Sequence, residues 1–250
     1  MFASKITMTN AWRASLVAVL GALIGLSLGA CSNSTQVGDP LFPLGEGRSW
    51  TYKNITKYDG PVDSVRETQT IKARGQEEIG GKPAWRRRSD TGVDYWLRFD
   101  DTGVYRIATK TDVDRDPKID PDPRFVLRKP YTVGTEWVNL TSPYILERPN
   151  EFSRKLSTVY KPFPMTYRID ALNETVETSA GTFKGCLRVA GRAVIKSYVD
   201  SSGVWDDVPL TTTEWYCPDV GLVRLIRREK STTKLVRGGE FIMDLAAWTK

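Results

Sequence analysis

The stretch "FKGCLRVAGRAVIKSYVDSSGVWDDVPLTTTEWYC", from Phe183 to Cys217, decides the fold of this chain. Valine, isoleucine, threonine and aromatic residues recur in both halves, which is the composition of β-strands. The centre, "DSSG", has Asp200 at the first and Gly203 at the fourth position of a turn, as is typical of type I. The stretch therefore predicts a β-hairpin. Pairing Asp200 with Gly203 places Cys186 opposite Cys217, or one step away if Gly203 forms a bulge.

The same strand signature continues in both directions along the chain. In "SWTYKNITKY", the alternate residues Trp50, Tyr52 and Asn54 fall on one face of an extended segment. The stretch "DYWLRFDDTGVYRIATK" predicts a second hairpin, which turns at residues 100–103. Beyond residue 30, no stretch of about a dozen residues shows the i, i+3, i+4 apolar pattern of a helix. We therefore predict an all-β fold of about a dozen antiparallel strands, arranged as one β-sandwich or as a curved half-barrel.

The composition excludes several classes of chemistry. Histidine is absent from the 250 residues, which excludes Ser-His-Asp and Cys-His nucleophile pairs and histidine-ligated metals. Charged residues (26%) and hydrophobic residues (40%) stand in the proportion of a globular protein. Without residues 1–30, which hold two cations and no anion, the net charge falls from +6 to +4. This mild charge does not indicate nucleic-acid binding.

The N-terminus has the organisation of a cleaved export signal. Lys5 and Arg13 give a basic start, and the 17 residues that follow, "ASLVAVLGALIGLSLGA", carry no charge. This run is at the short limit for a membrane-spanning helix, about 17–25 residues, and small residues end it. We predict a signal peptide at 1–30, a flexible polar tether at 31–40 and one β-rich domain at 41–250.

The last four residues of that region, "LGAC" (Leu28 to Cys31), resemble the lipobox of bacterial lipoproteins. The resemblance implies a diacylglycerol on the Cys31 thiol, cleavage by signal peptidase II just before it, and acylation of the new amine with a fatty acid such as palmitate. Two or three acyl chains would anchor the protein firmly on a bilayer. By resemblance to enterobacterial sorting, Ser32 in place of aspartate favours the outer over the inner membrane. The alternative is an ordinary secretory signal with an incidental cysteine.

Cys186 and Cys217 are the other two cysteines of the chain. Disulfides form in oxidising compartments such as the periplasm, where an exported envelope protein folds. Cross-strand neighbours lie about 4.5–5.5 Å apart at Cα, which is within disulfide range. We expect a disulfide between these residues; two buried free thiols are the alternative.

Three stretches resemble a pattern of exported β-rich bacterial proteins that have no assigned activity. They are "FPLGEGRSWTY" near the start, "VETSAGTFKGCLRV", and "EWYCPDVGLVR", and together they cover under a fifth of the chain. Cys217 departs from the pattern, because a small residue is expected before the proline. The resemblance implies a β-rich fold and no reaction. Half-barrel proteins of the lipoprotein-localisation pathway offer an architectural analogy only.

An acidic stretch, "DVDRDPKIDPDP", is a weak calcium candidate through five carboxylates: Asp112, Asp114, Asp116, Asp120 and Asp122. The first three match the first ligand positions of a calcium loop. Pro117 stands where such a loop needs glycine, however, and Pro123 stands where it needs glutamate. An exposed loop stiffened by prolines is the interpretation that the sequence favours. We assign no other metal ligand and no cofactor-binding residue.

Two basic clusters offer a hypothesis of contact with phosphates: Arg86, Arg87 and Arg88 in one, and Arg224, Arg227, Arg228, Lys230, Lys234 and Arg237 in the other. The alternative is the solvated face of antiparallel strands, where such residues also discourage edge-to-edge pairing. Carboxylates for glycoside hydrolysis are available, but no pair stands out: Glu67, Glu77, Glu78, Asp206 and Asp207. We assign no catalytic residue.

The sequence thus favours a non-enzymatic lipoprotein of the bacterial envelope, anchored in the membrane through Cys31, whose β domain binds or scaffolds a partner. The partner is an envelope protein, a lipid headgroup or a glycan, and not a nucleic acid. One alternative is a carboxylate-dependent hydrolase that acts on envelope glycan. Another is a carrier that holds an apolar ligand in a concave sheet.

Overall fold

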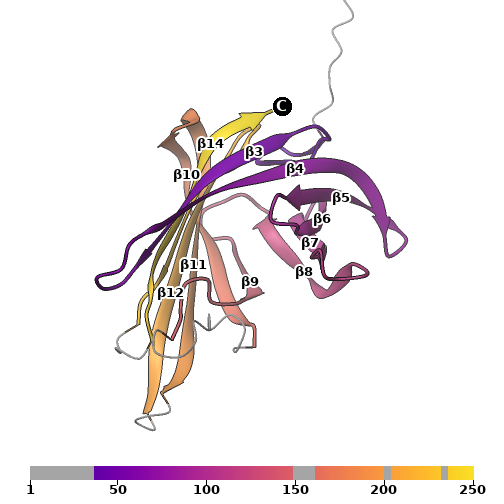
Figure 1. The fold of residues 1–250 in the computed structure, drawn as a ribbon. Helices are drawn as coiled ribbons and strands as arrows, with labels where there is room; N and C mark the ends of the chain where they lie inside the picture. The colour runs from indigo at the N-terminus through magenta and orange to yellow at the C-terminus, as the bar shows by residue number, and fades with distance from the viewer. Residues whose placement is uncertain (1–36, 149–160, 200–203, 232–235) are drawn as a thin grey trace, which may run out of the picture. The chain divides into compact units, whose positions relative to one another are not determined.

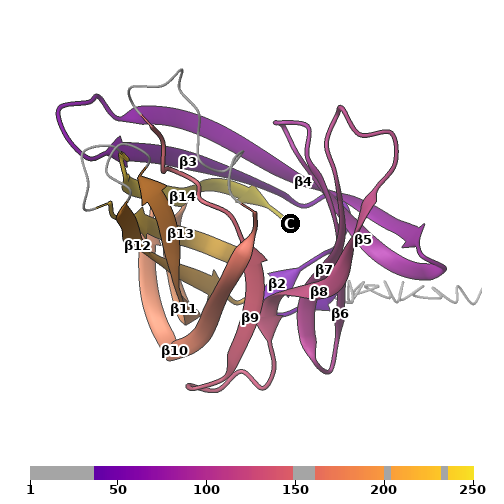
Figure 2. The same ribbon diagram turned by 90° about the horizontal axis from the view of Figure 1, so that it is seen from below.

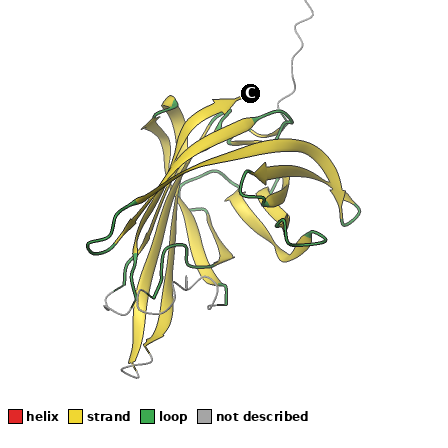
Figure 3. Ribbon diagram, viewed as in Figure 1, coloured by secondary structure: helices red, strands yellow, loops and turns green. Residues whose placement is uncertain are grey.

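The computed structural model describes residues 37–148, 161–199, 204–231 and 236–250. These residues form fourteen β-strands and no helix, so the predicted all-β class is confirmed (Figure 3). The strands are β1 (Gly38–Asp39), β2 (Phe42–Pro43), β3 (Ser49–Tyr58), β4 (Val65–Ile79), β5 (Lys82–Ser89), β6 (Asp94–Asp100), β7 (Gly103–Lys110), β8 (Lys118–Arg128), β9 (Glu136–Thr141), β10 (Phe163–Thr178), β11 (Gly181–Val199), β12 (Val204–Cys217), β13 (Gly221–Glu229) and β14 (Gly239–Thr249).

Twelve of these strands form a single antiparallel sheet, and β1 and β2 pair separately. The sheet consists of two meanders, β3 to β8 and β9 to β14, in which strands that follow each other in the chain pair with each other. The meanders join where β14 pairs with β3, from Gly239 opposite Tyr58 to Thr249 opposite Ser49. A single continuous sheet corresponds to the curved half-barrel, rather than to the sandwich, of the two predicted arrangements.

The sheet curls until its two edge strands, β8 and β9, approach each other (Figures 1 and 2). One hydrogen bond crosses this seam: the side-chain amide Nδ2 of Asn139 on β9 donates to the backbone carbonyl of Phe125 on β8, at 2.7 Å. The sheet is therefore nearly closed, and the inward side chains of its strands surround a common interior.

The hairpin predicted from Phe183 to Cys217 is formed by β11 and β12. Leu187 pairs with Tyr216, and the same register continues to Val199 opposite Val204, which is the predicted pairing. The next step of that register brings Cys186 to Cys217, and the structure contains a disulfide between them with a Cα–Cα distance of 4.1 Å. The predicted turn at 200–203 lies outside the described residues.

Alternation of buried and exposed residues also follows the prediction in β3, where Trp50, Tyr52 and Asn54 are all buried. The indole Nε1 of Trp50 donates to the carbonyl of Val220 at 2.7 Å, so this buried polar group is satisfied. Inward residues from both meanders form the main core cluster, together with Phe42 of β2.

The acidic stretch differs from the predicted loop. Its second half belongs to β8, which begins at Lys118 and includes Pro121 and Pro123. β8 is an edge strand, and an edge tolerates proline because one side of the strand has no partner that needs its N–H groups. The pairing of β7 with β8 also shifts register between Arg106 and Ala108, which accommodates the proline-rich segment.

The predicted signal peptide at 1–30, the lipobox cysteine Cys31 and most of the tether lie outside the described residues. The first described strand, β1, begins at Gly38, within the segment 31–40 that the sequence analysis assigns to the tether. In the part of the chain that is described, no helix has the length and hydropathy that crossing a membrane requires.

Candidate functional site

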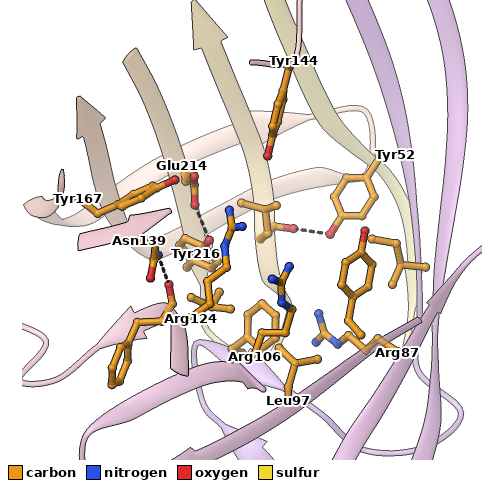
Figure 4. Close-up of a pocket in the computed structure, with 16 residues that line it drawn as sticks. Tyr52, Arg87, Leu97, Arg106, Arg124, Asn139, Tyr144, Tyr167, Glu214 and Tyr216 are labelled. Atoms are coloured by element: carbon orange, nitrogen blue, oxygen red, sulfur yellow. Dashed lines mark hydrogen bonds between the residues drawn. The ribbon is translucent and has the colours of Figure 1, made fainter. Parts of the chain in front are cut away.

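The interior of the curled sheet holds a cavity of about 350 Å³, which we call the central cavity (Figure 4). Its lining combines seven aromatic rings, four aliphatic side chains, three arginines, one asparagine and one glutamate. The residues are Phe42, Tyr52, Ile71, Arg87, Tyr95, Leu97, Arg106, Arg124, Phe125, Val126, Asn139, Tyr144, Tyr167, Glu214, Tyr216 and Leu222.

Strand register explains why the three arginines share this interior. Arg87 on β5 lies opposite Tyr95 on β6, so both project from one face of the sheet. Leu97 on β6 pairs with Arg106 on β7, and Arg106 pairs with Arg124 on β8. Residues directly opposite each other point to the same face, so this row places two guanidinium groups on the cavity side.

Arg87 is buried without an acidic partner. It is 8% exposed, and its guanidinium carbon lies 4.0 Å from the ring centroid of Phe42 and 4.1 Å from that of Trp50. One terminal nitrogen donates to the carbonyl of Pro43, while the Nε has no hydrogen-bond partner. Burial lowers the pKa of Arg87 to about 10, so the side chain remains charged at neutral pH.

Arg106 and Arg124 differ in their partners although they lie opposite each other. Arg106 donates two hydrogen bonds of 2.7 Å to the carboxylate of Asp120, a bidentate ion pair. Arg124 makes no hydrogen bond and no ion pair with any other described residue; Figure 4 shows its guanidinium group pointing into the cavity. The cavity therefore contains one neutralised and one unpaired arginine on adjacent strands.

Glu214 on β12 is the acidic group of the lining. The Tyr216 hydroxyl donates to its carboxylate, and the Thr212 hydroxyl lies at 3.4 Å from it. Burial raises the pKa of Glu214, although these hydrogen bonds and the charges of Arg227 and Arg124 oppose the rise. Burial and, less strongly, the charge of Glu214 raise the pKa of Tyr216. Tyr216 therefore remains a neutral hydrogen-bond donor.

The segment after β9 contributes Tyr144 to the lining. It is held by Glu229 of β13, whose carboxylate accepts the backbone N–H groups of Tyr144, Ile145 and Leu146 at 2.8–3.1 Å. Arg227 forms an ion pair with Glu229 at 2.6 Å, and its guanidinium carbon lies 4.0 Å from the centroid of the Tyr144 ring. This wall of the cavity is thus fixed by a buried ion pair.

The five calcium candidates do not converge. Asp112 pairs with Arg88, Asp114 with Lys118, and Asp120 with Arg106. Within the described residues, no group of three or more aspartate, glutamate, cysteine or histidine side chains is arranged to hold a metal ion. Asp116 and Asp122 take part in no such group.

The two basic clusters are paired with acids over most of their length. Arg86 and Arg88 both contact Asp94, at 2.8 and 2.6 Å. In the second cluster the pairs are Arg224 with Asp244, Arg227 with Glu229, Arg228 with Glu240, and Arg237 with Glu147. Lys234 lies outside the described residues.

Of the carboxylates named for glycoside hydrolysis, the described side chains of Glu67, Glu77, Glu78 and Asp207 do not line the central cavity. The side chain of Asp206 lies outside the described part of the chain. No role was predicted from the sequence for Arg106, Arg124, Glu214 or the cavity tyrosines. Arg87 was predicted to belong to a basic cluster that either contacts phosphates or forms a solvated strand face. Alternation offered a signal: in a strand through "RRR", the middle side chain faces away from its two neighbours.

No protein-family model and no curated protein sequence matches the chain. Among solved structures, it is similar to a candidate lipoprotein from Parabacteroides distasonis, with 14% identity and a TM-score of 0.37 over 86% of this chain and 100% of that chain. It is also similar to a candidate exported protein with a YmcC-like fold from Bacteroides fragilis, with 15% identity and a TM-score of 0.35 over 84% of this chain and 98% of that chain. The function therefore has to be inferred from the chain's own residues.

Proposed function

We propose that this chain is a lipid-anchored protein of the bacterial envelope whose β domain binds a small molecule in the central cavity. The observation that carries the proposal is the cavity itself. Its volume of about 350 Å³ falls at the lower end of the range of small-molecule sites, about 300–1,000 Å³. Seven aromatic rings offer apolar contact area, while arginine, glutamate and asparagine side chains supply directional polar groups.

Binding accounts for this lining better than hydrolysis does. Glycosidases use two carboxyl groups, about 5–5.5 Å apart in retaining enzymes and about 6.5–9.5 Å apart in inverting enzymes. Among the described residues, Glu214 is the one carboxylate that lines the cavity. A pure scaffold would be expected to have a filled interior. The carrier interpretation therefore has the stronger support. The cavity differs from the apolar pocket that we expected, because polar side chains also line it.

Binding is tested with N-phenyl-1-naphthylamine, a neutral aromatic amine that fluoresces in apolar surroundings. We expect saturable emission, excited through protein tryptophan, from the mature lipidated protein in non-ionic detergent. Leu222→Trp fills the cavity and should reduce the affinity at least tenfold. Val138→Trp, at a position that is 58% exposed on the outside of β9, is the matched control and should bind as the wild type does. Equal binding by both variants would refute an internal site.

The anchor is tested separately. The lipobox resemblance supports acylation of Cys31, and Ser32 supports sorting to the outer membrane. We expect radioactive palmitate to label the wild-type protein and not Cys31→Ser. Ser32→Asp should keep the label but move the protein to the inner-membrane fraction of a density gradient. Labelling of Cys31→Ser would overturn the anchor, and an unchanged fraction for Ser32→Asp would overturn the sorting.

A further inference from the structure

The charges that line the central cavity do not cancel. Arg106 is neutralised by its bidentate pair with Asp120. Arg124 and Glu214 interact electrostatically and offset each other in sign. Arg87 has no carboxylate partner among the described residues. Counted with Glu214 as a carboxylate, the lining carries an excess of one positive charge.

This arrangement is costly for a domain that has nothing bound. Arg106 and Arg124 lie directly opposite each other on adjacent strands, where like charges are destabilising, and the Asp120 carboxylate offsets one of the two charges. A buried guanidinium group without an acidic partner loses hydration that its two aromatic contacts restore only in part. The unpartnered Nε of Arg87 is a buried donor, and such groups cost free energy. An anion in the cavity would offset the positive charge of these arginines.

We propose that the ligand of the central cavity is an organic monoanion, with one carboxylate-type acid group held by the arginines and an aromatic or apolar body packed among the tyrosines. The inference rests on the proposed function and specifies the ligand class of the same site. Figure 4 shows Arg87, Arg106 and Arg124 together in the lining of the cavity. The guanidinium group of Arg87 lies between the rings of Phe42 and Trp50. Guanidinium groups bind carboxylates through short, charge-assisted hydrogen bonds.

The charge balance selects a monoanion over a dianion. One negative charge neutralises the excess, whereas a second would face the Glu214 carboxylate without a free cation to offset it. The body of the ligand is specified by the rings of Tyr52, Tyr95, Tyr167 and Tyr216, which line the cavity around the arginines. Such rings favour stacked or edge-on contact with another ring.

Three probes that share one aromatic body test the charge requirement. Titration calorimetry of the mature lipidated protein, in matched detergent buffer at pH 7, compares 2-naphthoate, 2-naphthamide and 2-naphthyl phosphate. We expect the monoanionic carboxylate to bind at least tenfold more tightly than the neutral amide, which has nearly the same shape. The dianionic phosphate should bind more weakly than the carboxylate. An amide as tight as the carboxylate would overturn the inference, and a tighter phosphate would overturn the monoanion.

Three variants locate the acid group. Arg124→Gln removes a side chain that makes no hydrogen bond or ion pair with a described residue, so it should leave folding intact and reduce the affinity for 2-naphthoate at least tenfold, with little change for 2-naphthamide. Arg192→Gln makes the same change at an exposed position on β11 and should alter neither. Glu214→Gln adds to the positive excess and should tighten 2-naphthoate alone. If Arg124→Gln and Arg192→Gln bind 2-naphthoate equally, the proposed subsite is wrong.

The two proposals fail in different ways. If N-phenyl-1-naphthylamine does not bind, or binds Leu222→Trp equally well, the internal site itself is refuted. If that neutral dye binds inside but 2-naphthoate shows no advantage over 2-naphthamide, the cavity remains a binding site and the monoanion inference is refuted.

Discussion

At the scale of single residues, Arg227 and Glu229 show how charge can be buried without an imbalance. Their side chains are 2% and 0% exposed, and each satisfies the other at 2.6 Å. Glu229 accepts three further backbone N–H groups, and Arg227 donates to the carbonyl of Ser142 at 2.8 Å. The pair therefore holds the Tyr144 segment in place, in contrast to Arg87 and Arg124, which lack acidic partners.

Removing one member of this pair leaves a buried, unpaired carboxylate. We expect Arg227→Met to lower the free energy of unfolding by about 3–5 kcal/mol, measured by urea denaturation. Arg228→Met is the control, because that side chain is 64% exposed and its ion pair with Glu240 contributes at most about 1 kcal/mol. Similar losses in both variants would contradict a structural role for the buried pair.

The pH dependence of stability should report on Glu214. Burial raises its pKa above the ordinary value of 4.5, so the folded state holds this proton more tightly than the unfolded state does. The wild type therefore loses stability as the pH rises from 4.5 through the raised pKa of the folded state. Glu214→Gln has no carboxyl group to ionise, so it does not lose this stability. We expect its melting midpoint to lie above that of the wild type at pH 7.

The same difference should shrink as the pH falls towards 4.5. Melting curves between pH 4 and pH 8 measure it, with the exposed Glu78→Gln as the control that should follow the wild type. A constant difference between Glu214→Gln and wild type across this range would contradict the assignment.

At the scale of elements, the β11–β12 hairpin is cross-linked at the end opposite its turn. The disulfide joins residues 31 positions apart, and closing a loop of that size contributes about 3–4 kcal/mol in the chain-entropy model. We expect the double variant Cys186→Ala and Cys217→Ala to lose about 2–4 kcal/mol in guanidinium denaturation. Reductant should destabilise the wild type and leave the variant unchanged; the same response in both would exclude a stabilising disulfide.

The elements that sequence could predict are those in which a local signal determines the pairing. The turn signature in the sequence predicted the register that β11 and β12 show, and alternation predicted the inward face of β3. β8 was missed because proline and aspartate are rare in strands, and only its edge position makes them acceptable there. A strand's place in the sheet is a property of the whole fold, which no local pattern records.

The central cavity could not be predicted for the same reason. Arg106 and Arg124 come together through the β7–β8 pairing, and Glu214 reaches them from the other meander. Arg87 was the easiest of these residues to predict from the sequence, because alternation places it on the opposite face from Arg86 and Arg88. Its burial, however, depends on Phe42 and Trp50, which are distant in sequence.

At the scale of the whole molecule, the sheet is continuous except at the seam between β8 and β9. Arg124, Phe125 and Val126 of β8 and Asn139 of β9 line the central cavity, so the seam borders the proposed binding site. The hydrogen bond from Asn139 to Phe125 spans the two edges. A ligand that enters between the edge strands would have to break this contact.

Asn139→Ala removes that bond and leaves the Phe125 carbonyl without its partner. We expect a loss of about 1 kcal/mol in stability and faster hydrogen exchange in residues 118–128 and 136–141. Exchange in the β11–β12 hairpin should not change, because its register is maintained by its own strands and by the disulfide. Thr166→Ala, an exposed neighbour on β10, is the control. Uniform exchange changes across the sheet would contradict a local seam.

The pairing of β3 with β14 has a consequence for the nascent polypeptide. An exported chain enters the periplasm from its N-terminus, so the first meander is complete before the final eleven-residue strand has crossed the membrane. Until then β3 exposes unpaired backbone groups along its full length, and such an edge invites intermolecular aggregation. A periplasmic chaperone that shields β3 would therefore be needed for longest when export of the last strand is delayed.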